Sequence, residues 1–103
     1  MLCALTVRKL KPGTFEEFKE AFQPPDEAVQ QGWVRFHMLQ SLEDENEAVS
    51  FGFFDGTIDE LNSSQNQHDY DSMVERIAPY VESVVSNGVY EVVVTKTRET
   101  TAA

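Results

Sequence analysis

The stretch that decides the fold is residues 33–55, Trp-Val-Arg-Phe-His-Met-Leu-Gln-Ser-Leu-Glu-Asp-Glu-Asn-Glu-Ala-Val-Ser-Phe-Gly-Phe-Phe-Asp. Side chains of different character alternate along residues 33–42 and again along residues 48–55, and a period of two is typical of β-strands. Residues 43–46 between these two runs, three acidic residues followed by Asn46, favour a polar turn. The sequence therefore predicts a β-hairpin with a polar connection.

The alternation also predicts which side chains share a face of the hairpin. In the first strand one face carries Val34, Phe36 and Met38, and the other carries Trp33, Arg35, His37 and Leu39. In the second strand one face carries Val49, Phe51 and Phe53, and the other carries Ala48, Ser50, Gly52 and Phe54. Apolar residues therefore occur on both faces of the hairpin.

A helix is expected before the hairpin. Residues 11–13, Lys-Pro-Gly, predict a turn, and Thr14 with Glu17 has the spacing of a capping box. The aromatic residues that follow have helical spacing: Phe15, Phe18 and Phe22. Pro24-Pro25 should end this helix, and residues 26–32 predict one more helical turn closed by a glycine.

A second helical region is expected after the hairpin. Thr57 and Glu60 again form a capping box, and the polar residues 62–67 predict a break. A longer helix is predicted over residues 69–85, with either a kink or the start of a new turn at Pro79. Its expected buried stripe comprises Tyr70, Met73, Val74, Ile77, Val81 and Val84.

The outermost predicted elements are two strands, residues 2–10 and 89–96, the second starting after a helix stop at Asn87-Gly88. Residues 97–103 are expected to be a tail, which leaves a single domain over residues 1–96. The order is β-α-β-β-α-β, the ferredoxin-like arrangement of the α+β class. It predicts a four-stranded antiparallel sheet with the helices on one face.

The apolar character of both strand faces predicts the oligomeric state. An antiparallel sheet with one face in water normally carries polar residues on that face. Here the strands are apolar on both sides, so a monomer would expose a larger apolar patch than soluble monomers usually do. A second copy that packs sheet against sheet about a two-fold axis would cover it. We therefore expect a homodimer.

Charge and cysteine content exclude several classes of function. The 103 residues include 18 acidic and 8 basic ones, a net charge of −10 that disfavours nucleic acids and anionic membranes as partners. No apolar run is long enough to span a bilayer, and the apolar N-terminus lacks the basic leader of a signal peptide. One cysteine and two histidines are a poor supply of metal ligands. We expect a cytoplasmic protein without metal or cofactor.

Four features in order resemble the dimeric α+β barrel superfamily, most nearly its antibiotic-biosynthesis-monooxygenase-like branch. The first is Lys-Pro-Gly followed by the Phe-bearing helix, within residues 9–22. The second is the glycine that leads into a strand, Gly32-Trp33-Val34. The third is residues 53–61, an aromatic strand end followed by a helix start, and the fourth is residues 68–80, a His followed by a helix with a Pro. The resemblance covers about residues 2–96.

The resemblance implies a dimeric α+β barrel, and it implies one of several activities. The branch includes cofactor-independent oxygenases of polycyclic aromatic polyketides, lactone isomerases, haem-degrading enzymes and members without established activity. Their ligands lie between sheet and helices or inside the dimeric barrel. Haem-degrading relatives use an Asn on the first strand, a Trp at the end of the third and a His on the second helical region. Here the first strand has no Asn, the Trp position holds Phe54, and His68 alone corresponds.

Two histidines are the candidate catalytic residues. His37 could act as a general base beside a cavity, since an imidazole accepts protons near neutral pH; it could equally lie in a dimer interface or pair with a carboxylate. His68 could correspond to the cleft His of the family, oriented by Asp69 or Asp71, or be a polar residue at a helix start. Arg35 could neutralise an anionic or phenolate ligand, or pair with Glu47 or Glu91 across strands.

Aromatic residues are the candidate ligand contacts, because aromatic walls suit a flat ring; for each of them, core packing is the alternative. The predicted contacts are Trp33, Phe54, Tyr70 and Tyr90. Two functions follow. One is a cofactor-independent monooxygenase or isomerase acting on a small aromatic or polyketide-like compound, and the other is a non-catalytic ligand-binding or assembly module of the same fold.

Overall fold

The computed structural model describes the backbone of residues 1–22, 32–64 and 67–98, and the side chains of these residues apart from 64 and 67–70. The elements, in chain order, are β1 (Leu2–Leu10), α1 (Phe15–Phe22), β2 (Trp33–Gln40), β3 (Glu47–Phe54), α2 (Ile58–Ser64), α3 (Gln67–Ile77), the 3-10 helix η2 (Ala78–Tyr80) and β4 (Val81–Glu91). The strands form one antiparallel sheet in the order β2-β3-β1-β4. The ferredoxin-like prediction is confirmed.

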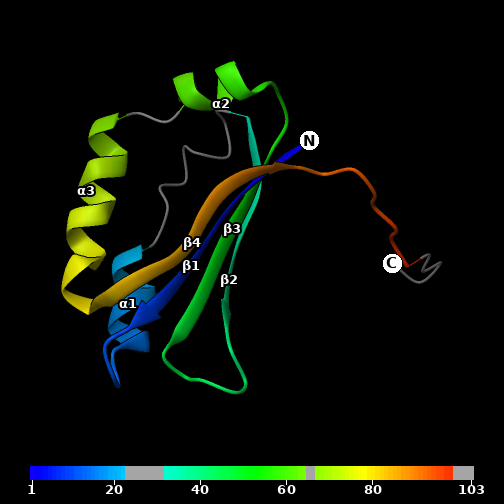
Figure 1. Cartoon of the computed structure of the whole chain (residues 1–103). Coiled ribbons are helices and arrows are strands. Elements are labelled where there is room, and N and C mark those ends of the chain that lie inside the picture. Colours follow the sequence, from blue (N-terminus) through cyan, green and yellow to red (C-terminus); the bar gives the residue numbers. More distant parts are fainter. Residues whose placement is uncertain (23–31, 65–66, 99–103) are drawn as a thin grey trace.

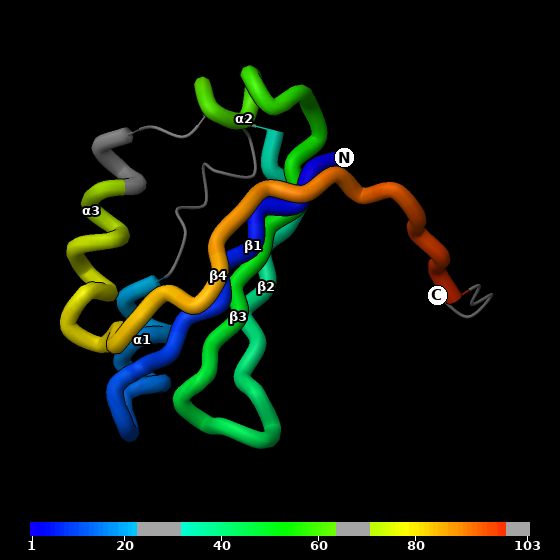
Figure 2. Tube along the Cα trace, in the orientation of Figure 1, coloured from blue at the N-terminus to red at the C-terminus, as the bar shows by residue number. Residues whose placement is uncertain are grey.

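The three α-helices lie on one side of the sheet (Figure 1). The tube in Figure 2 shows α1 and α3 beside one end of β1 and β4, and α2 near the other end. Two clusters of buried apolar residues separate the helices from the sheet. The predicted turn at residues 26–31 falls outside the described residues.

The first cluster lies beneath α1 and α3. Its fully buried members are Leu10 of β1, Phe18 of α1, Ala48 of β3 and Ile77 of α3. The two helices are also joined by a polar contact, because Arg76 Nε donates a hydrogen bond of 3.1 Å to the carbonyl oxygen of Ala21. This bond satisfies a carbonyl in the last turn of α1, where no intrahelical donor is available.

The second cluster is aromatic and lies beneath α2. Trp33 packs against Phe36 and Phe54 with ring centroids 5.0 and 5.2 Å apart, and Leu61 of α2 completes the cluster. The rings approach the backbone so closely that a Cβ at Gly52 would lie 2.7 Å from Phe36 Cδ1 and 3.0 Å from Trp33 Cζ3. The absence of a side chain at residue 52 therefore makes room for the cluster.

The helix starts differ in how closely they follow the predicted capping boxes. At α2 both bonds form: the Glu60 N–H donates to Thr57 Oγ1 at 3.2 Å, and the Thr57 N–H donates to Glu60 Oε1 at 3.1 Å. At α1 the Thr14 hydroxyl instead donates to the carbonyl oxygen of Lys11 at 2.7 Å. No bond joins Thr14 to Glu17 among the described contacts, so the box predicted there is wrong.

The predicted face of Trp33 is wrong because β2 is bulged. Trp33 pairs with Phe54, whereas Arg35 pairs with Phe53, so Val34 is an extra residue in the strand. A bulge of this kind reverses the alternation on one side of the extra residue. Trp33 therefore lies on the helix-facing side with Phe36, and Arg35 and His37 lie on the opposite side.

The helix predicted over residues 69–85 is too long. The α-helix ends at Ile77, η2 contains Pro79, and Val81 begins β4. Proline supplies no N–H for a continuing helix, and the residues beyond pair with β1. Asn87 and Gly88, predicted to stop the helix, lie within β4, and the strand ends at Glu91 rather than at residue 96.

The misleading helical spacing of the valines in this region has a structural cause. Val81 pairs with Leu10 and Val84 pairs with Arg8, and the register shifts between these two pairs. The shift brings residues three apart onto the same side of the strand. Apolar residues three apart therefore share a side in this bulged strand, and the same spacing in a sequence normally indicates a helix.

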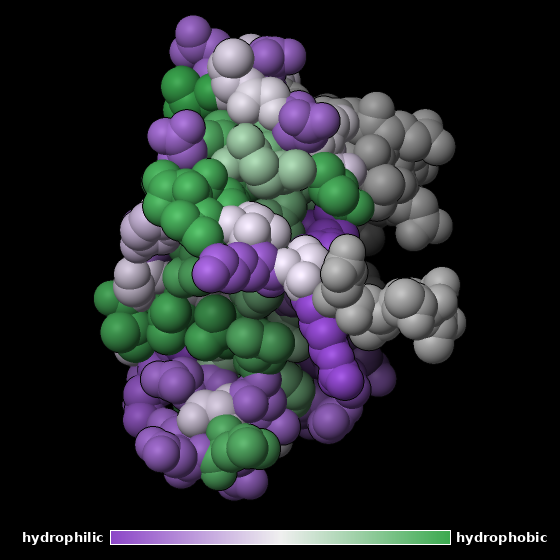
Figure 3. All heavy atoms as spheres, turned by 90° about the vertical axis from the view of Figure 1, so that its right-hand side faces the viewer, coloured by the Kyte–Doolittle hydropathy of each residue, from purple (hydrophilic) through white to green (hydrophobic). Residues whose placement is uncertain are grey.

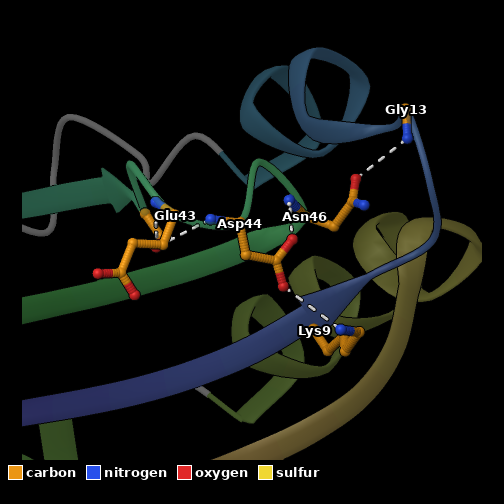
Figure 4. Close-up of polar contacts among 6 residues, drawn as sticks. Lys9, Gly13, Glu43, Asp44 and Asn46 are labelled. Atoms are coloured by element: carbon orange, nitrogen blue, oxygen red, sulfur yellow. Dashed lines mark hydrogen bonds and ion pairs between the residues drawn. The ribbon is translucent and has the colours of Figure 1, made fainter.

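The acidic hairpin tip is held by polar contacts (Figure 4). Asp44 accepts a hydrogen bond of 2.9 Å from the Asn46 N–H and pairs with Lys9 Nζ at 3.3 Å. The side chain of Asn46 in turn accepts a bond from the Gly13 N–H at 3.1 Å. These contacts attach the β2–β3 connection to β1 and to the turn before α1.

We predict that Gly52→Ala destabilises the fold by about 1–3 kcal/mol, because the added methyl group forces the Phe36 and Trp33 rings apart. Urea unfolding measures the change. Gly88→Ala is the control, since its Cβ would meet only the side chain of the exposed Tyr90, at 3.3 Å. Equal stabilities of the two variants would contradict the packing described for the aromatic cluster.

We also predict that the Asn46 N–H and the Lys9 ammonium hold the pKa of the Asp44 carboxyl below its usual range. The carboxyl then stabilises the fold above its unfolded-state pKa, and this contribution is lost as the pH falls through the lower folded-state pKa. NMR titration of Asp44 measures the pKa, which Lys9→Met should raise only in part, because the larger cause is the Asn46 bond. A value unchanged by Lys9→Met would show that the ion pair has no influence.

Candidate functional site

The side of the sheet opposite the helices, called here the open face, is apolar. Figure 3 views this side and shows a band of apolar side chains across the sheet, with hydrophilic ones at the lower end, where the β2–β3 connection lies. The strand register assigns to this face the apolar residues Cys3, Leu5, Val7, Leu39, Val49, Phe51, Phe53 and Tyr90. None of them is fully buried, because none of the helices in the described ranges covers them.

A cluster of rings and cations lies on the β2–β3 part of the open face. The His37 ring stacks on Phe51 with centroids 5.0 Å apart and an interplanar angle of 26°. Phe51 and Phe53 meet edge to face at 5.6 Å, and Arg35 Cζ lies 4.9 Å from the centroid of Phe53. His37, Phe51, Phe53 and Arg35 are named here the open-face cluster. It places an imidazole and a guanidinium over one pair of phenyl rings.

The contact with Phe53 takes the place of the cross-strand ion pair that was one of the two predictions for Arg35. In the described part of the chain Arg35 makes no ion pair with Glu47 or Glu91; its guanidinium lies over an aromatic ring instead. A cation in this position gains from the ring quadrupole and keeps its N–H groups available to a ligand. Arg35 can therefore still contact an anion placed over the cluster.

Two further side chains of the open face carry a hydroxyl or a thiol group. Tyr90 is half exposed on β4, opposite Cys3 of β1, and its hydroxyl can donate a hydrogen bond. Burial raises the pKa of the Cys3 thiol above its ordinary value, so the nucleophilic thiolate is disfavoured at neutral pH. Cys3 thus contributes to this face as an apolar residue.

The other predicted site residues lie on the helix-facing side. Trp33 and Phe54 are 7% and 2% exposed and pack in the aromatic cluster beneath α2. His68 and Tyr70 belong to α3, but their side chains fall outside the described part of the structure. The predicted residues with described side chains therefore divide between two faces, with Arg35, His37 and Tyr90 on the open face and Trp33 and Phe54 on the helix-facing side.

One polar pair on the helix-facing side was missed by the sequence analysis. Arg8 and Ser50 are each 6% exposed, and Arg8 Nη1 donates a hydrogen bond of 2.9 Å to Ser50 Oγ. The guanidinium also lies 5.9 and 5.5 Å from the ring centroids of Phe18 and Phe22. The available signal was the period of two in β1, which places Arg8 on the same face as Leu10, where both are buried.

The arrangement offers acid–base and charge-stabilising groups rather than metal ligands. Among the residues with described side chains, no group of three or more His, Cys, Asp or Glu residues could hold a metal ion. Within the same residues, none of the helices has both the length and the apolar character that crossing a membrane requires. The acid–base and charged groups described on the open face are the imidazole of His37, the guanidinium of Arg35 and the phenol of Tyr90.

Comparison with solved structures identifies the fold. A candidate antibiotic biosynthesis monooxygenase from Nitrosomonas europaea is similar, with a TM-score of 0.75 and 20% identity over 91% of this chain and 100% of that one. A variant of SnoaB, a cofactor-independent oxygenase from Streptomyces nogalater, has a TM-score of 0.72 and 16% identity over 91% and 94% of the two chains. An uncharacterised NIPSNAP domain protein from Burkholderia xenovorans has a TM-score of 0.67 and 15% identity over 95% and 100%.

The sequence itself matches no protein-family model, and no curated protein matches it. At sequence identities of 15–20%, the similarity to these structures shows the fold of the chain. The chain thus has the ferredoxin-like α+β fold of the antibiotic-biosynthesis-monooxygenase-like proteins, as its resemblance to them implied.

We predict that Ser50→Ala destabilises the protein by about 1–3 kcal/mol, because it leaves a buried Arg8 donor without this acceptor. A double-mutant cycle with Arg8→Met should give a coupling free energy of about 0.5–3 kcal/mol in denaturant unfolding. Ser86→Ala, an exposed serine of β4, is the control. Additive effects of the two substitutions would show that the Arg8–Ser50 bond contributes nothing.

Proposed function

We propose that the protein is a homodimer that binds a small aromatic or polyketide-like compound over the open-face cluster and oxidises it without a cofactor. The observation that carries this proposal is the cluster itself, in which His37 stacks on Phe51, Arg35 lies over Phe53, and the two phenyl rings meet edge to face. The fold shared with a cofactor-independent oxygenase supports the reaction class.

The apolar open face supports the proposed dimerisation. Its leucine, valine and phenylalanine side chains are only partly buried in one copy. Burial of apolar surface releases roughly 25 cal/mol per Å², so a second copy packed on this face gains stability. Such a pairing encloses the open-face cluster between two sheets. A ligand held there would be shielded from water, which strengthens its interactions with charged groups.

The chemistry uses the groups that the cluster provides. The His37 imidazole takes a proton from an acidic C–H or O–H of the ligand. The Arg35 guanidinium neutralises the resulting anion, and the phenyl rings hold the flat ring system by stacking. A methylene carbon that loses two hydrogens and gains one oxygen atom from O₂ releases the other oxygen atom as water. The reaction therefore balances without a further reductant.

The remaining predicted residues have secondary roles in this proposal. Tyr90 donates a hydrogen bond to a ligand carbonyl at the β4 side of the open face. His68 is the competing base, on the helix side of the sheet. Ligand contacts by Trp33, Phe54 and Tyr70, and the cytoplasmic location, stay predictions.

We predict that the protein consumes O₂ with hydroxylated polycyclic compounds that carry a methylene carbon between aromatic rings, and that His37→Ala lowers kcat by at least about 100-fold, since a positioned base contributes that much. Arg35→Gln should lower kcat/KM by weakening stabilisation of the anion. An oxygen electrode and product analysis measure both variants, and Lys11→Gln, which removes an equal charge in the turn before α1, is the control.

The same measurements on His68→Ala separate the alternatives. Loss of turnover in His68→Ala with full activity in His37→Ala would place the reaction on the helix side. Ligand binding without O₂ consumption would instead indicate a non-catalytic binding module. A monomer in sedimentation at micromolar concentration would contradict the enclosed site.

A further inference from the structure

One cross-strand row of the open face runs from the candidate base to the far edge of the sheet. The register pairs His37 of β2 with Phe51 of β3, and Phe51 in turn with Leu5 of β1. Leu5 pairs with Gly88 of β4, which completes the row. Three strand spacings of roughly 4.8 Å make the row roughly 14 Å long. A ligand bound at His37 can therefore extend across two apolar side chains toward β4.

The phenol of Tyr90 lies at the β4 end of this row. Tyr90 and Gly88 are two residues apart in β4, so they share the open face. A Cβ at Gly88 would lie 3.3 Å from the Tyr90 hydroxyl oxygen and 3.4 Å from its Cε2 and Cζ atoms. The ring of Tyr90 therefore leans back along the strand over Gly88. Because residue 88 has no side chain, the hydroxyl lies close to the sheet at the end of the row.

The polar groups at the two ends of the row are available to a ligand. His37 contacts the rings of Phe51 and Phe53. Among the residues whose side chains are described, none forms a hydrogen bond with this imidazole or with the hydroxyl of Tyr90, which is 52% exposed. A phenol that becomes covered normally has a hydrogen-bond partner. A ligand that covers the row must therefore supply an acceptor for the Tyr90 hydroxyl.

We propose that Gly88 and Tyr90 determine which substrates the open face accepts, by requiring an oxygen atom at the end of the ligand remote from His37. The inference rests on the proposed function and specifies the substrate class within it. The Tyr90 hydroxyl donates a hydrogen bond to this oxygen, while the His37 imidazole contacts the acidic C–H. Phe51 and Leu5 support the flat ring system between the two ends.

The length of the row selects the size of the ligand. Of the roughly 14 Å, contacts of about 3 Å at each end leave roughly 8 Å between the acidic carbon and the remote oxygen. An oxygen on the ring that carries the acidic carbon, or on the next ring, is too close to span this distance. An oxygen on the second fused ring beyond it is within reach. The expected substrate is therefore a linearly fused polycyclic compound with a carbonyl or hydroxyl oxygen on its terminal ring.

Two linear tetracyclic ketones test the inference. Both carry the methylene carbon in the second ring, and only one has a hydroxyl group on the remote terminal ring. The wild type should consume O₂ with the hydroxylated compound at a kcat/KM at least about fivefold higher, because the other compound leaves the Tyr90 hydroxyl without a partner. Tyr90→Phe should bring this ratio close to one. Equal wild-type values with O₂ consumed would overturn the inference and leave the proposed function intact.

Binding gives a readout that does not depend on turnover. Fluorescence titration with the same two compounds measures their dissociation constants, and the wild type should bind the hydroxylated compound at least about fivefold more tightly. A binding preference that Tyr90→Phe abolishes, without any O₂ consumption, would refute the proposed oxidation and support the inference. If neither compound binds, both proposals are wrong.

Substitution of Gly88 tests how the hydroxyl is placed. In Gly88→Val the new side chain occupies the space over which the Tyr90 ring lies, so the ring must turn aside. The preference for the hydroxylated compound should then fall to the level of Tyr90→Phe. Ser83→Val, at an exposed position of β4, is the matched control and should keep the preference. Urea unfolding verifies that both variants are folded, and a folded Gly88→Val variant with the wild-type preference would overturn the role of Gly88.

Discussion

Successive side chains of a strand point to opposite faces of a sheet, so strands that are apolar throughout need a cover on both faces. In this protein the three α-helices cover one face, and the other face keeps Leu5, Phe51 and Phe53 partly exposed. This difference in coverage between the two faces explains why the candidate site lies on the open face. Groups on the helix side are already packed, whereas the open face still has unsatisfied apolar surface.

The two arginines of the sheet illustrate the same division. Arg8 lies on the helix side, where aromatic rings and Ser50 surround its guanidinium. Arg35 lies on the open face over Phe53, with its N–H groups still accessible. Both are cation–π contacts, but a buried arginine with hydrogen-bond partners serves packing, and an exposed one remains able to receive a ligand. Burial thus separates a structural cation from a candidate binding cation.

The sequence predicted the element order and the hairpin because both depend on local patterns, the period of two in β3 and the capping box at Thr57. The predictions were wrong wherever the pairing between strands is irregular. The extra residue Val34 reversed the side of Trp33, and the register shifts of β4 made Val81 and Val84 resemble a helix. Bulges arise from pairing between distant strands, so local spacing cannot reveal them. For the same reason the sequence grouped Trp33 with His37, which lie on opposite faces.

The bulge at Val34 decides which face of the sheet receives the indole of Trp33. Because Val34 is an extra residue, Trp33 and Arg35 lie on opposite faces although they are two apart in the sequence. A strand of the same length without the bulge would place both on one face and would turn the indole out of the interior toward the surface that carries His37. The cavity left under α2 would then demand a compensating change at Leu61 or Phe36, so the irregular pairing of one strand keeps the interior filled and leaves the open face to Arg35 and His37.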